Sequence, residues 1–209
     1  AGRTCVVWEA IHDDEKKKFA VKSLATEYKK DREQITFLKH EYTVGKNLSH
    51  PYVLHVHEFD IDRDLPFVAM DFFNGPNLKQ KLREGPTQIA HRAEKIIDQA
   101  ADGLHYFHEQ GWVHRDVKPD NVLVNDNDEL KWIDFAIAQK PKSGIAKLLS
   151  LKGKVQGTRS YMSPEQIRGE ACDRRADIYS FGCMAYEILT GKVPYTAGSA
   201  DDLLVKHLK

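Results

Sequence analysis

The sequence predicts an α+β protein of two lobes, a small first lobe built mainly from antiparallel strands and a larger, mainly helical second lobe. Up to about Phe73, short apolar and β-branched runs are separated by turn signals, which is typical of strands. After "NGPN" at 74–77 the apolar residues recur at helical spacing instead. We therefore expect the first lobe at about 1–73, a hinge at about 71–77 and the second lobe at about 78–209.

The first lobe is predicted to hold a hairpin, one helix and a further strand. "TCVVWEAIH" and "KFAVKSL" flank the turn "DDEKK", which is the pattern of a β-hairpin. A helix is indicated in "REQITFLKHEYTVGKNL", before "SHP" ends the segment. Its apolar residues at helical spacing are Ile35, Leu38, Tyr42 and Leu48. "LPFVAMDFF" is typical of another strand.

The second lobe is predicted to begin with an amphipathic helix that ends before Gly111. Its apolar stripe consists of Ala93, Ile96, Ile97, Ala100, Leu104 and Phe107. "VLVNDNDELKWI" indicates a short hairpin. "ADIYSFGCMAYEILTG" is apolar on nearly all sides, which is typical of a helix buried at the centre of a lobe, and "DDLLVKHLK" indicates a further helix.

Composition excludes several classes of partner and site. The 31 basic and 31 acidic residues cancel, so no overall field favours nucleic acid or an anionic membrane. Cys5, Cys172 and Cys183 are odd in number and widely spaced, which disfavours a disulfide framework or a zinc site and indicates a reducing, cytoplasmic setting. No apolar run approaches the roughly 18 residues of a membrane span. We expect no membrane contact from this segment, which could still be the cytosolic part of a larger, membrane-anchored protein.

A charged octapeptide carries the strongest functional signal. "HRDVKPDN" at 114–121 places two carboxylates, a lysine, an arginine and an asparagine around one proline. A surface loop could carry such charges without a function, but a loop that holds a nucleophile, a phosphate and a divalent ion needs this assortment. Three further motifs accompany it: "FAVK" at 19–22, "IDFA" at 133–136 and "YMSPEQ" at 161–166.

Together these motifs resemble the protein kinase catalytic domain. "HRDVKPDN" resembles its catalytic loop, "FAVK" the strand that carries its lysine, "IDFA" its metal-binding DFG motif and "YMSPEQ" its APE box. The segment "GTRSYMSPEQIRG" is most similar to bacterial-type serine/threonine kinases. The resemblance runs from residue 2 to about 208 and implies the two-lobed kinase fold. Because "DDLLVKHLK" looks like the helix after the buried one, we expect the last helices of that fold to be missing from this chain.

The resemblance implies a role for each polar residue of the loop. Asp116 is the expected base or orienter for the substrate hydroxyl. Lys118 resembles the lysine that steadies the transferring phosphate in kinases acting on serine and threonine rather than tyrosine. Asn121 and Asp134 offer the oxygen ligands that suit Mg²⁺.

Lys22 and Glu41 are expected to form an ion pair across the nucleotide site. An ammonium in an apolar strand is costly to bury without partners, so Lys22 should meet both the ATP phosphates and a carboxylate. Glu41 follows it by 19 positions, as in the family pattern. The residues that the resemblance places against ATP are Gly2, Val7, Ala20, Lys22, Met70, Asp71, Phe73 and Leu123.

The resemblance also implies regulation by phosphorylation and a structural support for the catalytic loop. Arg115 is similar to the arginine that binds a phosphate on the activation segment. His114 is expected to be a core element under Phe135, and Asp177 to hold the backbone of the loop. The candidates for autophosphorylation are Ser143, Ser150, which is favoured, and Thr158, which more closely resembles the threonine that touches Asp116 and Lys118.

Three positions depart from the family pattern. Ala136 replaces the glycine of DFG, which penalises a positive φ there and restricts how the motif can flip. Gly45 stands where the family has a large apolar residue, so we expect a gap beside Phe135 and a loosely held helix. Cys5 replaces a glycine of the phosphate-covering loop.

Two functions therefore remain open. The intact polar set favours an active serine/threonine protein kinase that uses ATP and Mg²⁺ to phosphorylate protein substrates. The three departures favour a pseudokinase, a nucleotide-binding scaffold or regulatory module. Phosphorylation of a small molecule is disfavoured by the peptide-docking segment "GTRSYMSPEQ".

Overall fold

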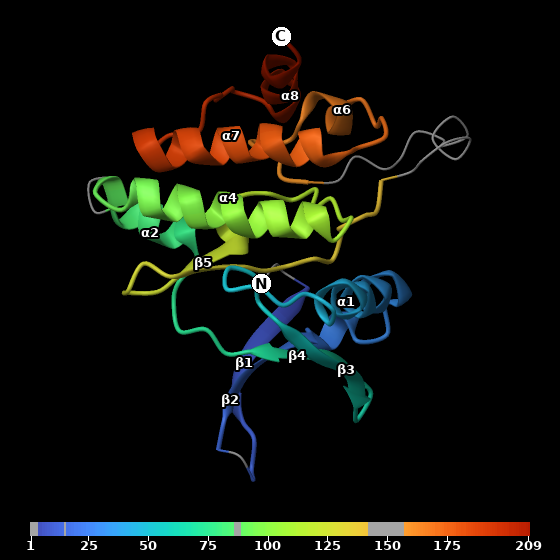
Figure 1. Ribbon diagram of the computed structural model, residues 1–209. Coiled ribbons are helices and arrows are strands. Elements are labelled where there is room, and N and C mark those ends of the chain that lie inside the picture. The colour runs from blue at the N-terminus through green and yellow to red at the C-terminus, as the bar shows by residue number, and fades with distance from the viewer. Residues whose placement is uncertain (1–3, 15, 86–88, 142–156) are drawn as a thin grey trace.

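The first lobe is a four-stranded antiparallel sheet with one long helix against it (Figure 1). The computed structural model describes residues 4–14, 16–85, 89–141 and 157–209. The strands lie in the order β1-β2-β4-β3, and all three pairs are antiparallel. Their bounds are β1 Cys5–Ile11, β2 Lys18–Leu24, β3 Val56–Asp62 and β4 Leu65–Asp71, and the helix α1 spans Arg32–Gly45 after a short 3₁₀ turn at Thr26–Tyr28.

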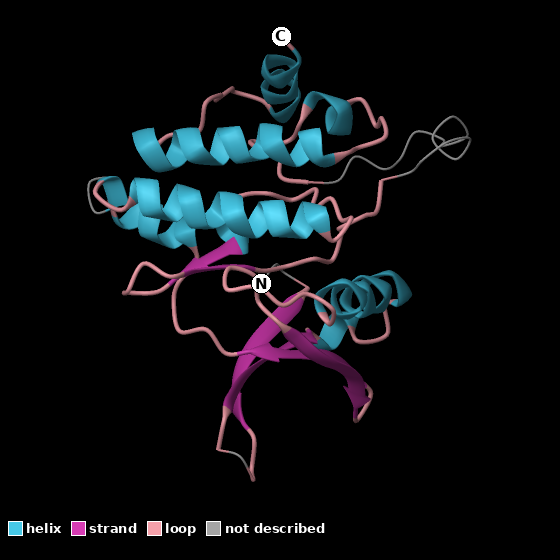
Figure 2. Ribbon diagram, viewed as in Figure 1, coloured by secondary structure: helices cyan, strands magenta, loops and turns pink. Residues whose placement is uncertain are grey.

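The second lobe is mainly helical, with its longest helices α4 and α7 stacked in successive layers and α8 beyond them (Figures 1 and 2). A small hairpin lies between these helices and the first lobe. The elements are α2 Leu78–Glu84, α4 Ala93–Glu109, a 3₁₀ turn Pro119–Asn121, β5 Val122–Val124, β6 Leu130–Trp132, α6 Pro164–Ile167, α7 Arg174–Thr190 and α8 Ala200–Leu208. The predicted two-lobed α+β fold is confirmed.

Local sequence explains where α1 and α2 begin and where α7 ends. The Asp31 carboxylate accepts hydrogen bonds from the first N–H groups of α1, which an isolated helix end leaves unsatisfied. Asn77 and Gln80 form a reciprocal capping box at the start of α2, directly after the segment that leaves β4. Gly191 ends α7 in the left-handed conformation at φ 72°, where glycine has no steric penalty.

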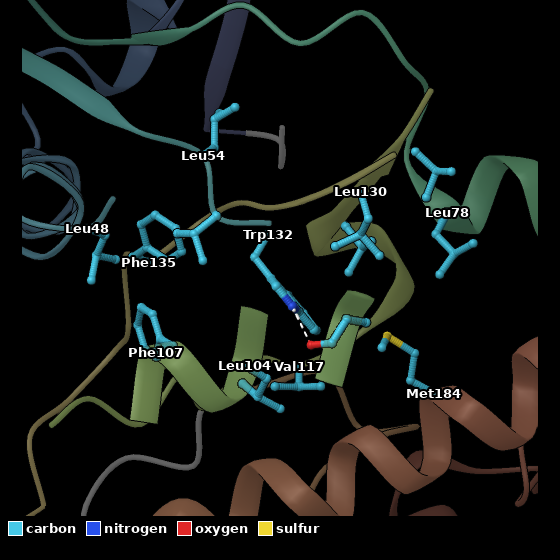
Figure 3. Packing of buried hydrophobic residues seen from close by; sticks show 14 of the residues in the cluster. Leu48, Leu54, Leu78, Leu104, Phe107, Val117, Leu130, Trp132, Phe135 and Met184 are labelled. Atoms are coloured by element: carbon cyan, nitrogen blue, oxygen red, sulfur yellow. Dashed lines mark hydrogen bonds between the residues drawn. The ribbon is translucent and has the colours of Figure 1, made fainter. Parts of the chain in front are cut away.

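The core continues from one lobe into the other around two aromatic residues (Figure 3). Trp132 on β6 is buried, and its indole N–H donates to the carbonyl of Ala100 on α4 at 2.9 Å. A Cβ at Gly103 would lie 2.7 Å from the Trp132 ring, so only glycine lets α4 approach β6 this closely. Phe135 stacks on Phe107 with ring centroids 5.4 Å apart. This packing holds the residues 133–136, which directly follow β6, against the core.

Two expectations about packing need correction. No gap lies beside Gly45, because a Cβ there would overlap with the Val56 side chain and lie 3.3 Å from the Phe135 ring. The β-branched side chain of Val56 on β3 fills the space that the sequence pattern leaves open at Gly45. The helix α7, expected to be buried on nearly all sides, is buried on one face only, since Ile178 and Leu189 are 57% and 65% exposed.

Among the described helices, none combines the length and apolarity that a membrane span requires.

Candidate active site

Asp177 on the core helix α7 holds the charged loop 114–121 in place. Its carboxylate accepts hydrogen bonds from the backbone N–H groups of His114 and Arg115, both at 2.7 Å, and from the His108 ring at 2.8 Å. Asp177 is fully buried, so these three donors compensate for the loss of water around its charge. Arg115 is held at a positive φ of 68°, which turns the chain sharply just before Asp116.

Asp116 lies at the centre of a hydrogen-bond cluster. Its Oδ2 accepts from the Lys118 ammonium at 2.6 Å and from the Asn121 amide at 3.0 Å. Its Oδ1 accepts from the N–H and the hydroxyl of Thr158, each at 3.2 Å. The Lys118 ammonium also donates to the Thr158 hydroxyl at 2.8 Å. Thr158, 42 positions further along the chain, thus touches both residues that the resemblance names for it.

A second cluster joins the two lobes. The Lys22 ammonium on β2 lies 2.7 Å from Oε2 of Glu41 on α1 and 3.3 Å from Oδ1 of Asp134. Burial acts to lower the pKa of Lys22, but Asp134 and Glu41 together raise it above its usual value. Burial raises the pKa of Glu41 against the attraction of Lys22. For Asp134 the attraction of Lys22 and its hydrogen bond outweigh the effect of burial, so the pKa of Asp134 is lowered. Lys22 therefore stays protonated and Asp134 ionised at neutral pH.

Between the lobes lies a cavity of about 370 Å³ that reaches both clusters. Its apolar part is lined by side chains such as Val7, Met70 and Leu123, and its polar part by Lys22, Glu41, Asn121 and Asp134. The structure brings seven of the residues expected to contact ATP into this lining: Val7, Ala20, Lys22, Met70, Asp71, Phe73 and Leu123. Gly2 lies outside the described residues.

The cavity also has residues in its lining that sequence reasoning missed. Ile133 and Asp120 directly precede Asp134 and Asn121, so their adjacency to predicted ligands could have indicated them. Leu54 carries no such local signal, because it precedes β3 and reaches the site only through the fold.

The residues present fit a divalent cation bound together with phosphate. Both hydrogen bonds from the Asn121 amide nitrogen go to Asp116, one to its carbonyl and one to its carboxylate, which leaves the amide oxygen for another ligand. Asp134 supplies an ionised carboxylate in the same cavity. Within the described part of the chain, no group of three or more His, Cys, Asp or Glu side chains could hold a metal by itself. An ion here would need further oxygen ligands from a bound phosphate. Mg²⁺ commonly binds in this way, with one or two protein ligands beside the phosphate.

The remaining expected residues have separate outcomes. His114 packs against Phe135 with ring centroids 5.9 Å apart, as the resemblance implies. Arg115 donates to the Gln139 side chain at 2.9 Å, and its Nε is buried without a hydrogen-bond partner. Ser143 and Ser150 lie outside the described residues. Ala136 is not among the described residues with a positive φ, while Asp134 is, at 67°.

Comparison with known proteins identifies the family that the sequence matches. The sequence matches the protein kinase domain family over residues 1–209. It is 35% identical to a probable serine/threonine-protein kinase of Clostridium acetobutylicum, an alignment that covers 100% of this chain and 31% of that protein. It is 32% identical to the serine/threonine-protein kinase PknB of Mycobacterium tuberculosis, covering 91% of this chain and 31% of PknB. The chain thus spans about a third of the length of these relatives.

Proposed function

This chain belongs to the protein kinase domain family, and on that premise we propose that it transfers the γ-phosphate of ATP to serine and threonine hydroxyls of proteins. One observation carries the proposal. Six polar side chains from distant parts of the chain form two clusters, and four of the six, Lys22, Glu41, Asn121 and Asp134, line one cavity between the lobes. The six side chains are Lys22, Glu41, Asp116, Lys118, Asn121 and Asp134.

Phosphoryl transfer requires positioning and charge compensation more than covalent chemistry from the protein. Bound ATP with Mg²⁺ would supply the phosphoryl group and part of the compensating charge. Asn121 and Asp134 would hold the cation through their side-chain oxygens. Lys22 would direct its ammonium at the phosphates while Glu41 fixes its position. Val7, Ala20, Met70 and Leu123 would enclose the adenine ring, next to the backbone of Asp71–Phe73.

Asp116 and Lys118 would act on the protein substrate. The Asp116 carboxylate would orient the attacking hydroxyl and accept its proton. Lys118, 2.6 Å away, would hold that carboxylate in position and neutralise charge on the phosphoryl oxygens. The N–H and the hydroxyl of Thr158 both donate to Oδ1 of Asp116, so Thr158 would lie beside a substrate hydroxyl that reaches this carboxylate.

We extend the proposal to setting and regulation. Three free cysteines are consistent with a cytoplasmic location, either free or as the cytosolic part of a larger protein. Autophosphorylation on the activation segment, favoured at Ser150, would give the partly unsatisfied Arg115 guanidinium an anionic partner.

A phosphotransfer assay tests the proposal against the scaffold alternative. The full-length protein that carries this domain would be incubated with labelled ATP, Mg²⁺ and a degenerate serine/threonine peptide library. We expect labelled peptide with the wild type and none with Asp116→Asn, while both bind ATP with similar affinity. Nucleotide binding without any labelling of peptide or protein would establish the pseudokinase function instead. Absence of nucleotide binding would refute both functions.

A further inference from the structure

Outside the cavity between the lobes, three residues from three separate segments form a further ionic cluster. Glu187 on α7 accepts from the Lys79 ammonium at 2.5 Å with one carboxylate oxygen and from the Tyr161 hydroxyl at 2.5 Å with the other. Lys79, on α2, also donates to the Tyr161 hydroxyl at 3.2 Å. The cluster joins α2, the first helix after the hinge, to α7 and to the segment 157–163. Lys79 lies 82 positions before Tyr161 and 108 before Glu187.

The burial of this cluster makes its charge balance important. The side chains of Glu187 and Lys79 are only 5% and 21% exposed, and Tyr161 is buried. A buried carboxylate that loses its cation is strongly destabilising, because water cannot replace the lost partner. Burial and the hydrogen bond to Glu187 raise the pKa of Tyr161, so its hydroxyl stays protonated and donates. Lys79 is therefore the group that compensates the Glu187 charge.

Tyr161 is linked to Asp116 through Thr158. Its N–H donates to the carbonyl of Thr158 at 2.9 Å, which closes a turn between the two residues. Its own carbonyl accepts from the Ser180 hydroxyl on α7 at 2.6 Å. Thr158, at the other end of the turn, meets both Asp116 and Lys118. The position of Thr158 at Asp116 thus depends on how Tyr161 is anchored.

We propose that Lys79 is a positioning residue that, by neutralising the buried Glu187, holds Tyr161 and the segment 157–163 in register with Asp116 and so shapes the place where a protein substrate docks. This inference rests on the proposed function for the role of Asp116. The ordering of the segment does not, because it follows from the contacts of Lys79, Tyr161 and Glu187 themselves.

The test compares Lys79→Met, which removes the charge, with Lys79→Arg, which keeps it. Lys81→Met is the matched control, since Lys81 lies on the same helix and pairs with the fully exposed Asp126 at 3.6 Å. Hydrogen exchange of full-length protein reports on the segment 157–163 without any need for activity. We expect exchange there to be about tenfold faster in Lys79→Met, because local opening becomes easier once Glu187 lacks a cation, and unchanged in Lys79→Arg and Lys81→Met.

Kinetics and a compensating variant separate positioning from a general loss of structure. With the degenerate peptide library, Lys79→Met should lower kcat/KM for peptide about tenfold while the Kd for ATP changes less than about twofold, because the nucleotide cavity does not contain Lys79. Adding Glu187→Gln to Lys79→Met should restore both exchange and kinetics, since a neutral amide needs no cation and can still accept from Tyr161.

Each outcome decides the matter. Wild-type exchange and kinetics in Lys79→Met would overturn the proposal, and so would failure of the double variant to recover. If Lys79→Met does not fold, the double variant decides alone, because charge compensation requires it to fold. If the wild type phosphorylates nothing but exchange changes as expected, the proposed function fails while the ordering role of Lys79 stands.

Discussion

The Lys22 ammonium lies 2.7 Å from the Glu41 carboxylate, and this contact joins the central strand β2 to the helix α1. The two side chains are 12% and 3% exposed, so neither can exchange its partner for water without a local opening. The same ammonium reaches Asp134 at 3.3 Å. One cation therefore connects the sheet, the helix and the segment "IDFA" at 133–136.

Replacement of Lys22 by Met should remove both contacts and leave Glu41 uncompensated. We expect a loss of about 3 kcal/mol in the free energy of unfolding, measured by urea denaturation, because breaking a buried pair leaves an unpaired charge. Lys18→Met serves as the control, since Lys18 pairs with Glu9 at an exposed site. Equal effects of the two variants would mean that the buried pair contributes no more than a surface pair.

Asp116→Asn should abolish phosphotransfer while ATP still binds. The amide keeps the shape of the side chain but cannot accept the proton of the hydroxyl, so we expect a fall in kcat of about 10²- to 10⁴-fold. Steady-state assays with labelled ATP, together with calorimetric binding, would separate the two effects. The exposed Asp126→Asn controls for loss of one negative charge. A variant with wild-type kcat would remove Asp116 from the mechanism.

Asp134→Asn should make nucleotide affinity independent of Mg²⁺. The wild-type protein should bind ATP more tightly with Mg²⁺ than after removal of the metal with a chelator, because the ionised Asp134 attracts the cation. The neutral amide should erase most of that difference. Measuring the Kd for ATP in both conditions tests this, and a variant that keeps the full Mg²⁺ effect would point to other ligands.

A pair of glycine substitutions tests the packing of α1. Gly45→Ala forces a Cβ into Val56 and should destabilise the protein by about 1 to 3 kcal/mol, as overpacking usually does. Gly182→Ala on α7 has open space around the new Cβ and should stabilise it by about 0.5 to 1 kcal/mol through helix propensity. Thermal unfolding of both variants is the measurement. Stabilisation by Gly45→Ala would show that a gap exists there after all.

The buried His207 should make stability depend on pH below neutrality. Burial lowers its pKa from 6.5. Its ring lies 2.9 Å from the Tyr179 hydroxyl and packs edge-on against Tyr195, with ring centroids 4.9 Å apart. Between the lowered pKa and 6.5 the unfolded chain binds more protons than the folded one, so stability falls as the pH drops below about 6.5.

Denaturant titrations of the wild type and His207→Gln at pH 7.5 and 5.5 would measure this dependence. The wild type should lose more free energy of unfolding between the two pH values than the variant, which has no group titrating at this position. An identical pH slope in the two proteins would assign the dependence to other groups.

The sequence alone determined the α+β class, the two-lobed order and the polar set of the site. Helices and strands leave a local periodicity, and motifs such as "HRDVKPDN" keep several functional side chains within one short loop. These features depend on residues that lie close together in the sequence. The family that the motifs indicated is confirmed by the match over residues 1–209, whereas the roles of the site residues stay predictions.

Only the tertiary structure decided which distant residues meet. Val56 fills the space beside Gly45, and Lys79 neutralises Glu187 108 positions away. Neither contact leaves a periodic or local signal, because each depends on the packing of whole elements against one another. A lysine on a short helix and a glutamate on a long one look like ordinary surface charges until the fold buries them together.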